Sequence, residues 1–510
     1  MIFRAFMALL ALAAAVPAHA AERQWQAAET EHFIIYSKSP QERIEDLAAD
    51  LETYDRLMRM ATATRAEEPS VKVRIYEVDN TDDIQRALGV SNTGIAGFYD
   101  SNVLGPYLVT PRTIVFETSS AAFTPALVRH HEYAHHFMLQ YFPSVYPDWY
   151  VEGFAELIAS SKRMSDGRIG YGMAAKHRGA DIAANWVSLR EILTSERVTD
   201  YFDTYGQGWA LTHFFTFDND RANQLRAYLN ALAGGKSMKD AAQVFGDLDD
   251  LNREARRYVT AGYFNYRPVK VDIAQPVIRR TNPLSAGEAA LIPEVIAFDD
   301  VPLESYRKPG ERERQRKRRE TNLQRIREKA QAHPNDQFAL YFLAEAENVS
   351  GNYAQAQAAV DRLLAIQPGH VRGLARKSML MSRQAATLQG PARAATIAQA
   401  RALAARANKA DTVDPLPLLA YYESYRLVGE KPPEVAIEGL MQAVSTLPRD
   451  AGIRLRLVNE LEGAGRYAEA IDWIMPIAND PHDSPLRSAA KEQLERLRQE
   501  SARAQSRTAG

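Results

Sequence analysis

Two segments near the C-terminal end of the chain share a spacing of small and aromatic residues that constrains the fold. Residues 340–368 and 455–481 both contain Gly-x-Tyr-x-x-Ala, and both reach a proline about twelve residues after the alanine. In an internal repeat of this length each copy forms one supersecondary unit, and stacked copies bury a common core. The small residues would let two antiparallel helices approach closely, and the proline would end the second helix. The pattern therefore predicts stacked helix pairs, which we place at residues 321–495.

A partial copy of the pattern lies between these two segments. Ala436, Ala443 and Pro448 repeat part of it, and Ala436 precedes Ala470 by 34 residues. Residues 371–415 fit a further, irregular helix pair. The spacing resembles the tetratricopeptide repeat (TPR), although the Trp and several other consensus positions of that repeat are missing. The resemblance implies a groove for a peptide or protein partner and no chemistry of its own.

Composition excludes several classes of protein and of site. The chain has 510 residues, of which 46% are hydrophobic and 25% charged, as in globular proteins of two to four domains. A formal net charge of −2 argues against nucleic acid as the main partner. Cysteine is absent, which excludes disulfides, cysteine nucleophiles and thiolate metal sites. Any bound metal must therefore be held by histidine and carboxylate side chains.

The N-terminus has the features of a secretory signal peptide. Arg4 precedes an apolar run from Met7 to Val16, and residues 18–20 read Ala-His-Ala, a small-x-small cleavage pattern. The apolar run is short for a membrane-spanning helix, and no later stretch is long and apolar enough for one. We expect cleavage after Ala20 and an exported, periplasmic product without a transmembrane segment. An uncleaved anchor is the alternative.

The rest of the chain changes from mixed strand and helix signals to helical signals. The runs 32–37 and 71–78 are β-rich, and the apolar spacing of 42–60 is helical. Short strands are also expected in GIAGFYDS, YLVTP and TIVFETS, before residue 120. Strands followed by helices predict an α+β domain, here residues 21–267. The later helices are expected at residues 123–141, 148–163, 206–217, 221–233 and 237–262.

Two further segments complete the predicted organisation. Residues 268–320 are expected to form a proline-containing linker with a basic segment, and residues 496–510 a disordered tail. Eleven basic and four acidic residues give the interval 307–329 a net charge of +7. We interpret it as a solvated helix face with local ion pairs. A docking patch for an anionic partner or a membrane surface is the alternative.

One stretch carries the pattern of a metal-dependent hydrolase. RHHEYAHHF contains H-E-x-x-H, with His131, Glu132 and His135 at the defined positions. On a helix, positions four apart share a face, so both imidazoles can reach one Zn²⁺. Glu132 would then lie beside the water that a metallopeptidase activates, as its general base. The alternative is a surface histidine cluster, because His130 and His136 flank the motif.

A second helix, PDWYVEGFAEL, offers the remaining ligand. A hydrolytic zinc site needs three protein ligands and an open position for water. Glu152 supplies a carboxylate, and Glu156 follows one turn later on the same face. A carboxylate at Glu156 would accept the N–H of a ligating imidazole and so fix its orientation. The alternative is two solvated carboxylates, but the apolar neighbours predict a buried helix, where a charge needs a partner.

HEYAH followed by WYVEGFAEL resembles the gluzincin branch of zinc peptidases. Members carry H-E-x-x-H and then a helix with the third ligand, often inside an E-G-F-A run. The alanyl aminopeptidases and the peptidase-MA-like domains of bacterial exported proteins are similar. The resemblance implies a zincin-like fold and one Zn²⁺ per chain, held by His131, His135 and Glu152. It also implies that Glu132 is the general base and that Glu156 supports the ligands.

A weaker likeness lies downstream. TYGQGWALTHFF resembles the aminopeptidase segment in which a tyrosine precedes x-x-Gly and an apolar helix. The resemblance implies that Tyr205 hydrogen-bonds the developing oxyanion. Tyr201 is close by and the chain has 23 Tyr, so a packing role is the alternative. For His213 we expect a core or surface position rather than a place in the cleft.

One departure from the family bears on specificity. Aminopeptidases carry Gly-x-Met-Glu-Asn on the strand before the zinc helix, and its Glu captures the free amine of the substrate. TIVFETSS occupies the comparable region here, and its Glu117 lies closer to His131 than the family pattern requires. This favours an endopeptidase over an aminopeptidase.

Together these features predict an exported zinc peptidase whose repeats recruit a protein substrate or partner. A non-catalytic adaptor or chaperone-like protein with a metal-stabilised, peptidase-like domain is the alternative. Glu132 argues against that alternative, because structural zinc needs no general base.

Overall fold

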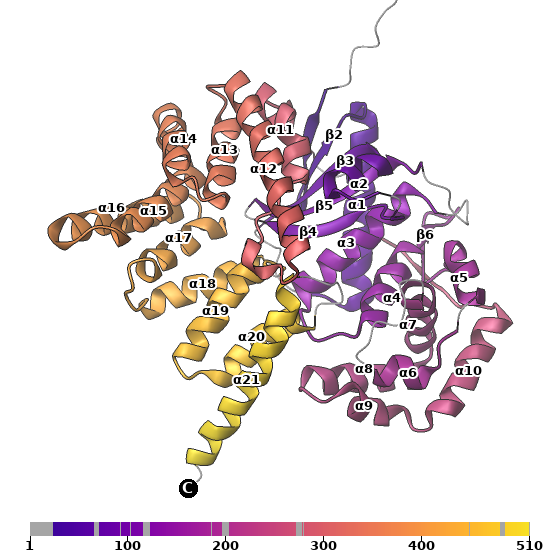
Figure 1. The fold of residues 1–510 in the computed structure, drawn as a ribbon. Helices are drawn as coiled ribbons and strands as arrows, with labels where there is room; N and C mark the ends of the chain where they lie inside the picture. Colours follow the sequence, from indigo (N-terminus) through magenta and orange to yellow (C-terminus); the bar gives the residue numbers. More distant parts are fainter. Residues whose placement is uncertain are drawn as a thin grey trace, which may run out of the picture.

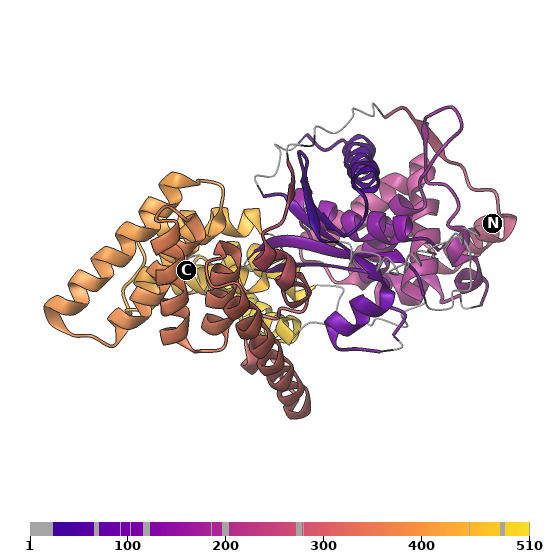
Figure 2. The ribbon, with the colours of Figure 1, turned by 90° about the horizontal axis from the view of Figure 1, so that it is seen from above.

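The computed structural model describes residues 24–65, 71–91, 93–102, 104–115, 123–184, 186–195, 203–271, 278, 280–447, 449–479 and 485–508. The predicted signal peptide lies outside these residues. The chain has a sheet-containing half, from β1 (Gln26–Glu29) to β9 (Arg280–Pro283), and a helical half that begins at α11 (Ala286–Ile296) (Figure 1). Seen from above, the later helices of the helical half, drawn in orange, extend away from the sheet (Figure 2). Among the described residues, no helix combines the length and apolar character needed to cross a membrane.

A six-stranded sheet organises the first half, in the order β4-β5-β3-β2-β1-β9. The pairs β2–β3 and β3–β5 are parallel, and the other neighbours are antiparallel. The strands are β1 (Gln26–Glu29), β2 (Phe33–Ser37), β3 (Val73–Asn80), β4 (Phe98–Asn102), β5 (Gly105–Thr113) and β9 (Arg280–Pro283). The strands predicted at 32–37 and 71–78 are confirmed. TIVFETS contributes only its first residue to β5, and its last four residues lie outside the described ranges.

Alternating side chains of the central strands enter two different cores. Ile35 and Ile75 point to one face, where they pack against α1 and α3. Tyr36 and Tyr76, one residue later in each strand, point to the opposite face and pack against α11, α12 and α13. This alternation is the period of two that a β-strand imposes. The helical half therefore covers one face of the sheet directly.

The helices that follow the sheet lie close to where the sequence predicts them. Thr124 caps the first turn of α3 through its hydroxyl, and Pro125 occupies the first helical position. A small sheet of β6 (Lys162–Arg163), β7 (Ile169–Tyr171) and β8 (Arg267–Val269) lies beside them. The helices of this half are α1 (Gln41–Thr62), α2 (Thr81–Leu88), α3 (Pro125–Tyr141), α4 (Asp148–Ala159), α5 (Gly179–Ala184), α6 (Leu189–Thr194), α7 (Gly208–Phe217), α8 (Asn219–Ala233), α9 (Met238–Ala241) and α10 (Leu248–Ala261).

Antiparallel helix pairs form a TPR-like solenoid (α13–α21) in the second half. Gly351 and Gly465 sit in equivalent turns with φ of +79° and +73°, a conformation that favours glycine. Ala356 and Ala470 of the repeated pattern are fully buried between helices, so the predicted helical repeat is confirmed. Its helices are α13 (Gln337–Val349), α14 (Tyr353–Ile366), α15 (Val371–Ala386), α16 (Gly390–Ala410), α17 (Pro415–Arg426), α18 (Glu434–Thr446), α19 (Ala451–Gly463), α20 (Tyr467–Ala478) and α21 (Pro485–Thr508).

The structure differs from the predicted linker and tail. The interval 268–320 contains β9, α11 (Ala286–Ile296) and the first half of α12 (Pro309–Ala332). α11 shows no helical alternation in sequence because it is buried between the sheet and α12. α21 continues to Thr508, through most of the predicted tail, with ion pairs one turn apart along its exposed surface.

The basic segment is largely neutralised within the protein. Arg316 pairs with Glu313 and Glu320 on α12 itself. Arg319 pairs with Asp299, and Arg327 pairs with Glu347 of α13. These contacts favour the interpretation of a helix face with ion pairs over that of a docking patch.

Candidate metal centre

The helix α3 carries both histidines of the motif on its buried side. Tyr133, Ala134 and Phe137 of the same helix enter the core under the sheet. This packing holds His131 and His135 four residues apart on one face, and each is about nineteen-twentieths buried. Apolar side chains on both sides of the motif thus fix the direction in which the two imidazoles point.

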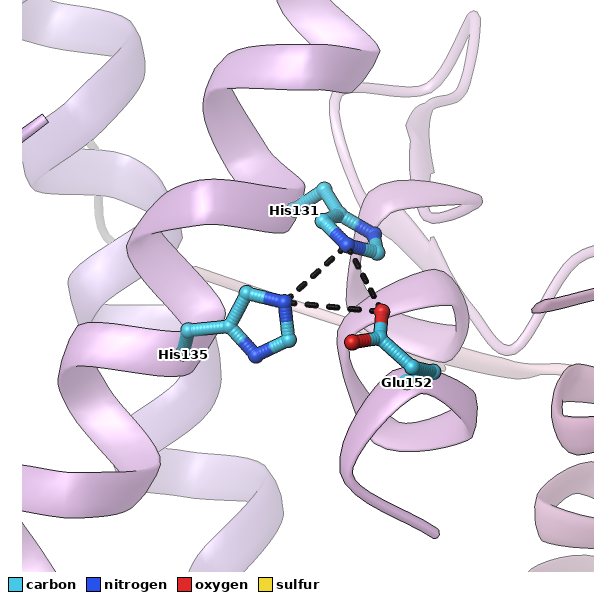
Figure 3. A group of neighbouring side chains, drawn as sticks. All are labelled: His131, His135 and Glu152. Carbon is cyan, nitrogen blue, oxygen red and sulfur yellow. Dashed lines mark hydrogen bonds and ion pairs between the residues drawn. The ribbon is translucent and has the colours of Figure 1, made fainter. Parts of the chain in front are cut away.

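The helix α4 brings a carboxylate to these imidazoles. Oε2 of Glu152 lies 3.2 Å from Nε2 of His131 and 3.6 Å from Nε2 of His135. The two Nε2 atoms are 3.1 Å apart. The three side chains point toward one another from two helices (Figure 3). The predicted burial of α4 is also confirmed, because Glu152 and its apolar neighbours are almost inaccessible to solvent.

These distances fit the donor set of a zinc ion. A tetrahedral zinc with ligands at 2.0–2.2 Å separates its ligand atoms by about 3.4 Å. The three observed separations, 3.1, 3.2 and 3.6 Å, surround this value. Two imidazole nitrogens and one carboxylate also leave a fourth position for water or substrate. His131, His135 and Glu152 therefore fit the ion that the motif implies.

The charges of the cluster favour a cation between its carboxylates. Burial lowers the pKa of His131, but Glu152 and Glu156 outweigh it and raise that pKa to about 10. Burial raises the pKa of Glu152, yet the two imidazoles hold it well below the usual range of a carboxyl. For His135, burial dominates and lowers the pKa. A buried carboxylate of this kind needs a positive partner, which a bound metal ion or a protonated imidazole supplies.

Glu156 lies next to His131 and is part of a buried ion network. Its Oε1 is 3.4 Å from Nδ1 of His131, and its carboxylate is fully buried. His177 approaches Oε2 at 2.6 Å, and Arg178 donates to Oε1 through two nitrogens at 2.7 and 3.1 Å. Burial raises the pKa of Glu156, but Arg178 and the two histidines hold it well below the usual range. The network fixes the carboxylate that faces His131.

The sequence analysis missed His177 and Arg178. They lie 21 and 22 residues after Glu156, on a short turn, and no local pattern connects them to it. A buried carboxylate does require partners, so their existence was predictable although their identity was not.

Glu132 and Tyr205 both border the open side of the cluster. They line one cavity together with His131 and His135. The ring of Tyr205 stacks on His131, with ring centres 5.6 Å apart and planes 21° from parallel. The guanidinium of Arg178 also lies over the Tyr205 ring, 4.7 Å from the ring centre. Tyr205 belongs to a π-helical turn, Asp203–Gln207, of the kind that often marks functional sites.

Three glycines let the elements around the cluster approach closely. A Cβ on Gly153 of α4 would collide with the carbonyl oxygen of Gly208 and with Oγ1 of Thr212 on α7. A Cβ on Gly97, just before β4, would lie 2.5 Å from Val128 and 3.3 Å from Cγ of Glu132. The absence of side chains at these positions sets the distances from α4 to α7 and from β4 to α3.

The remaining candidates lie elsewhere. His213 is a buried core residue, as expected: Nε2 contacts the carbonyl oxygen of Gly172 at 2.8 Å, and Nδ1 contacts Tyr258 at 2.7 Å. Glu117 and Tyr201 lie outside the described residues.

A second acidic and histidine group, Glu31, His32 and Glu52, also has close ligand atoms. There Nδ1 of His32 lies 2.6 Å from Glu52, its backbone N–H donates to the same carboxylate, and Glu31 is exposed. We therefore interpret this group as an internal ion pair between His32 and Glu52.

Comparison with known proteins adds little to this site. No protein-family model matches the chain, and no curated protein sequence matches it. A solved thermophilic TPR protein from Thermus thermophilus is 22% identical, with coverage of 38% of this chain and 99% of that chain and a TM-score of 0.31. A TPR protein from Parabacteroides merdae is 12% identical, and the alignment covers 56% of this chain and 90% of that protein, with a TM-score of 0.29. The helical repeat is therefore read from the chain's own helix pairs, and the zincin-like fold stays a prediction.

Proposed function

We propose that the protein is a zinc-dependent peptidase of the gluzincin type, in which a TPR-like solenoid recruits the protein substrate or a partner. The observation that carries the proposal is the convergence of Nε2 of His131, Nε2 of His135 and Oε2 of Glu152 at separations suited to tetrahedral zinc. Glu132 borders the same cavity, and a site that is only structural does not need this carboxylate.

The chain's own residues divide the work of amide hydrolysis. When bound, zinc lowers the pKa of a water molecule and polarises a carbonyl group. Glu132 takes the proton from the attacking water and delivers it to the leaving amine. The hydroxyl of Tyr205 donates a hydrogen bond to the oxyanion that develops on the scissile carbonyl. Glu156, held by His177 and Arg178, keeps the imidazole of His131 in one orientation.

Metal content and hydrolysis of a peptide library test this proposal. The purified chain should bind one zinc ion, Glu152→Ala should lose it, and Glu132→Gln should keep it while losing hydrolysis. Glu438→Gln, which removes an exposed helix carboxylate in α18, is the matched control and should change neither property. A chain that binds no metal after zinc is supplied, or a Glu132→Gln variant that remains fully active, would refute the proposal.

The second candidate function is a non-catalytic adaptor. It is favoured by the solenoid, since stacked helix pairs offer an extended surface for protein partners. The peptidase needs Glu132 for hydrolysis, whereas the adaptor does not need Glu132 for partner binding. An adaptor would hold its partner equally well in the parent and in Glu132→Gln, and neither chain would hydrolyse any member of the library.

A further inference from the structure

The cavity at the metal centre is shared between the two halves of the molecule. Its volume is about 1100 Å³, at the upper end of the range for ligand pockets. The first half contributes the motif residues of α3 and the edge strand β4. The solenoid contributes the opposite wall, with Met379, Leu419, Arg449 and Ile453 among its lining residues. A peptide that reached His131 would therefore contact the solenoid as well.

Arg449 is the cation that the solenoid places against the edge strand. It lies between α18 and α19, and its side chain is 17% exposed. Its Nε is 3.8 Å from Oδ1 of Asp100, and its guanidinium lies 5.6 Å from the ring centre of Tyr99. Tyr99 in turn contacts Nδ1 of His136, the residue after the ligand His135, at 3.0 Å. Arg449 thus contacts Tyr99, a side chain that packs on α3 beside the motif.

Two other arginines of the cavity wall are held in ion pairs between helices of the solenoid. Arg376 pairs with Glu345 at 2.5 Å, and Arg456 pairs with Glu423 at 2.7 Å, both within the solenoid. The carboxylate that Arg449 faces, Asp100, is instead half exposed and belongs to the opposite wall. Its longer contact is of the kind that the carboxylate of a bound peptide can replace.

We propose that Arg449 binds a carboxylate of the peptide substrate, so that the solenoid sets the specificity of the cleavage site. Arginine presents five N–H donors in a planar fork and binds a carboxylate through two parallel hydrogen bonds. The carboxylate comes from an acidic side chain or from the C-terminus of the peptide. This inference rests on the proposed peptidase function, which supplies the peptide in the cavity.

Equilibrium binding tests the inference without requiring turnover. Dansyl-labelled decapeptides of alanine and leucine carry one Asp at a scanned position or Asn in its place, each as a free acid and as an amide. Their dissociation constants are measured on the full chain, zinc-loaded, in a Glu132→Gln background. Adding Arg449→Gln should weaken binding of the carboxylate-bearing peptides about tenfold or more and leave their neutral twins unchanged. If the effect of Arg449→Gln on the dissociation constant disappears when Asp is replaced by Asn, Arg449 binds the side-chain carboxylate. If the effect disappears when the free acid is replaced by the amide, Arg449 binds the C-terminal carboxylate.

Arg456→Gln is the control, since it removes the same charge from the same cavity wall. It should preserve the preference for carboxylate. Equal dissociation constants for charged and neutral peptides on the parent, or a uniform loss for all peptides with Arg449→Gln, would overturn the inference. So would the absence of binding by every peptide. Carboxylate-selective binding in the Glu132→Gln background, combined with no peptide hydrolysis by the chain that retains Glu132, would instead refute the proposed function and leave the recognition by Arg449 intact.

Discussion

At the scale of single residues, the buried carboxylate of Glu156 lies 3.4 Å from Nδ1 of His131 and is held by Arg178. Glu156→Gln keeps the shape but removes the charge that balances Arg178 and faces Nδ1 of His131. We expect the affinity for zinc to fall about 10–100-fold. The metal-free chain should lose about 1.5–3 kcal/mol of stability, because His177 and Arg178 lose a fully buried carboxylate while Arg178 keeps its contact with Asp181. A zinc titration and a urea unfolding curve measure the two effects.

The control for Glu156 is Glu469→Gln, which removes the partner of Arg466 on the solvent-exposed surface of α20. Surface pairs contribute little, so zinc affinity and stability should both stay unchanged. Parental zinc affinity in Glu156→Gln would show that the network stabilises the fold without orienting the ligand.

Tyr205 makes a separate prediction about the reaction itself. Tyr205→Phe keeps the ring that stacks on His131 but removes the hydroxyl proposed to stabilise the oxyanion. We expect kcat to fall about 10²–10³-fold with KM and zinc content nearly unchanged. Tyr263→Phe, at an exposed tyrosine, is the comparison and should be neutral. An unchanged kcat in Tyr205→Phe would show that the hydroxyl of Tyr205 plays no part in the reaction and that the residue serves only in packing.

At the scale of elements, the site depends on how closely α4 approaches α7. Gly153→Ala inserts a methyl group against Gly208 and Thr212, so the two helices must separate. We expect a loss of about 1–3 kcal/mol of stability and a weaker zinc site, since Glu152 is the preceding residue of the same helix. Gly463→Ala, where an added Cβ meets nothing, should not destabilise the protein. Calorimetry and zinc titration give both values, and a Gly153→Ala chain with parental zinc affinity would contradict this coupling.

The elements around the site were predictable to different degrees. α3 and α4 followed from apolar periodicity and from motif spacing, because their burial and their chemistry lie within one stretch of sequence. α11 did not follow, since it is largely apolar without a clear amphipathic period and has Pro293 inside the helix. The contact of β4 with α3 through Gly97, and that of Arg449 with Asp100, join residues far apart in the chain. No spacing rule reports such contacts, so the proximity of His131, His135 and Glu152 was predictable and the wall of the cavity was not.

At the scale of the whole molecule, one hydrophobic core contains residues from both halves, which limits where the chain can be truncated. Tyr36 and Tyr76 of the sheet are buried against α11, α12 and α13. A chain that ends at residue 300 keeps α11 but would expose the part of this face that α12 and α13 cover. Burial of each large side chain contributes about 1.5–3 kcal/mol, and several would be lost together. We expect that truncation to be unfolded or aggregated, as judged by circular dichroism and light scattering.

A chain that ends at residue 366 separates the role of the sheet cover from that of the later repeats. It keeps α11–α14 over the sheet but removes Arg449 and the wall from α15 onward. Because repeats interact mainly with their neighbours, we expect this chain to fold and to bind zinc. Its metal centre would face solvent, so the preference for carboxylate-bearing peptides should disappear while hydrolysis of short neutral peptides persists. If the preference survives, the specificity resides in the sheet half, and the solenoid serves only to recruit partners.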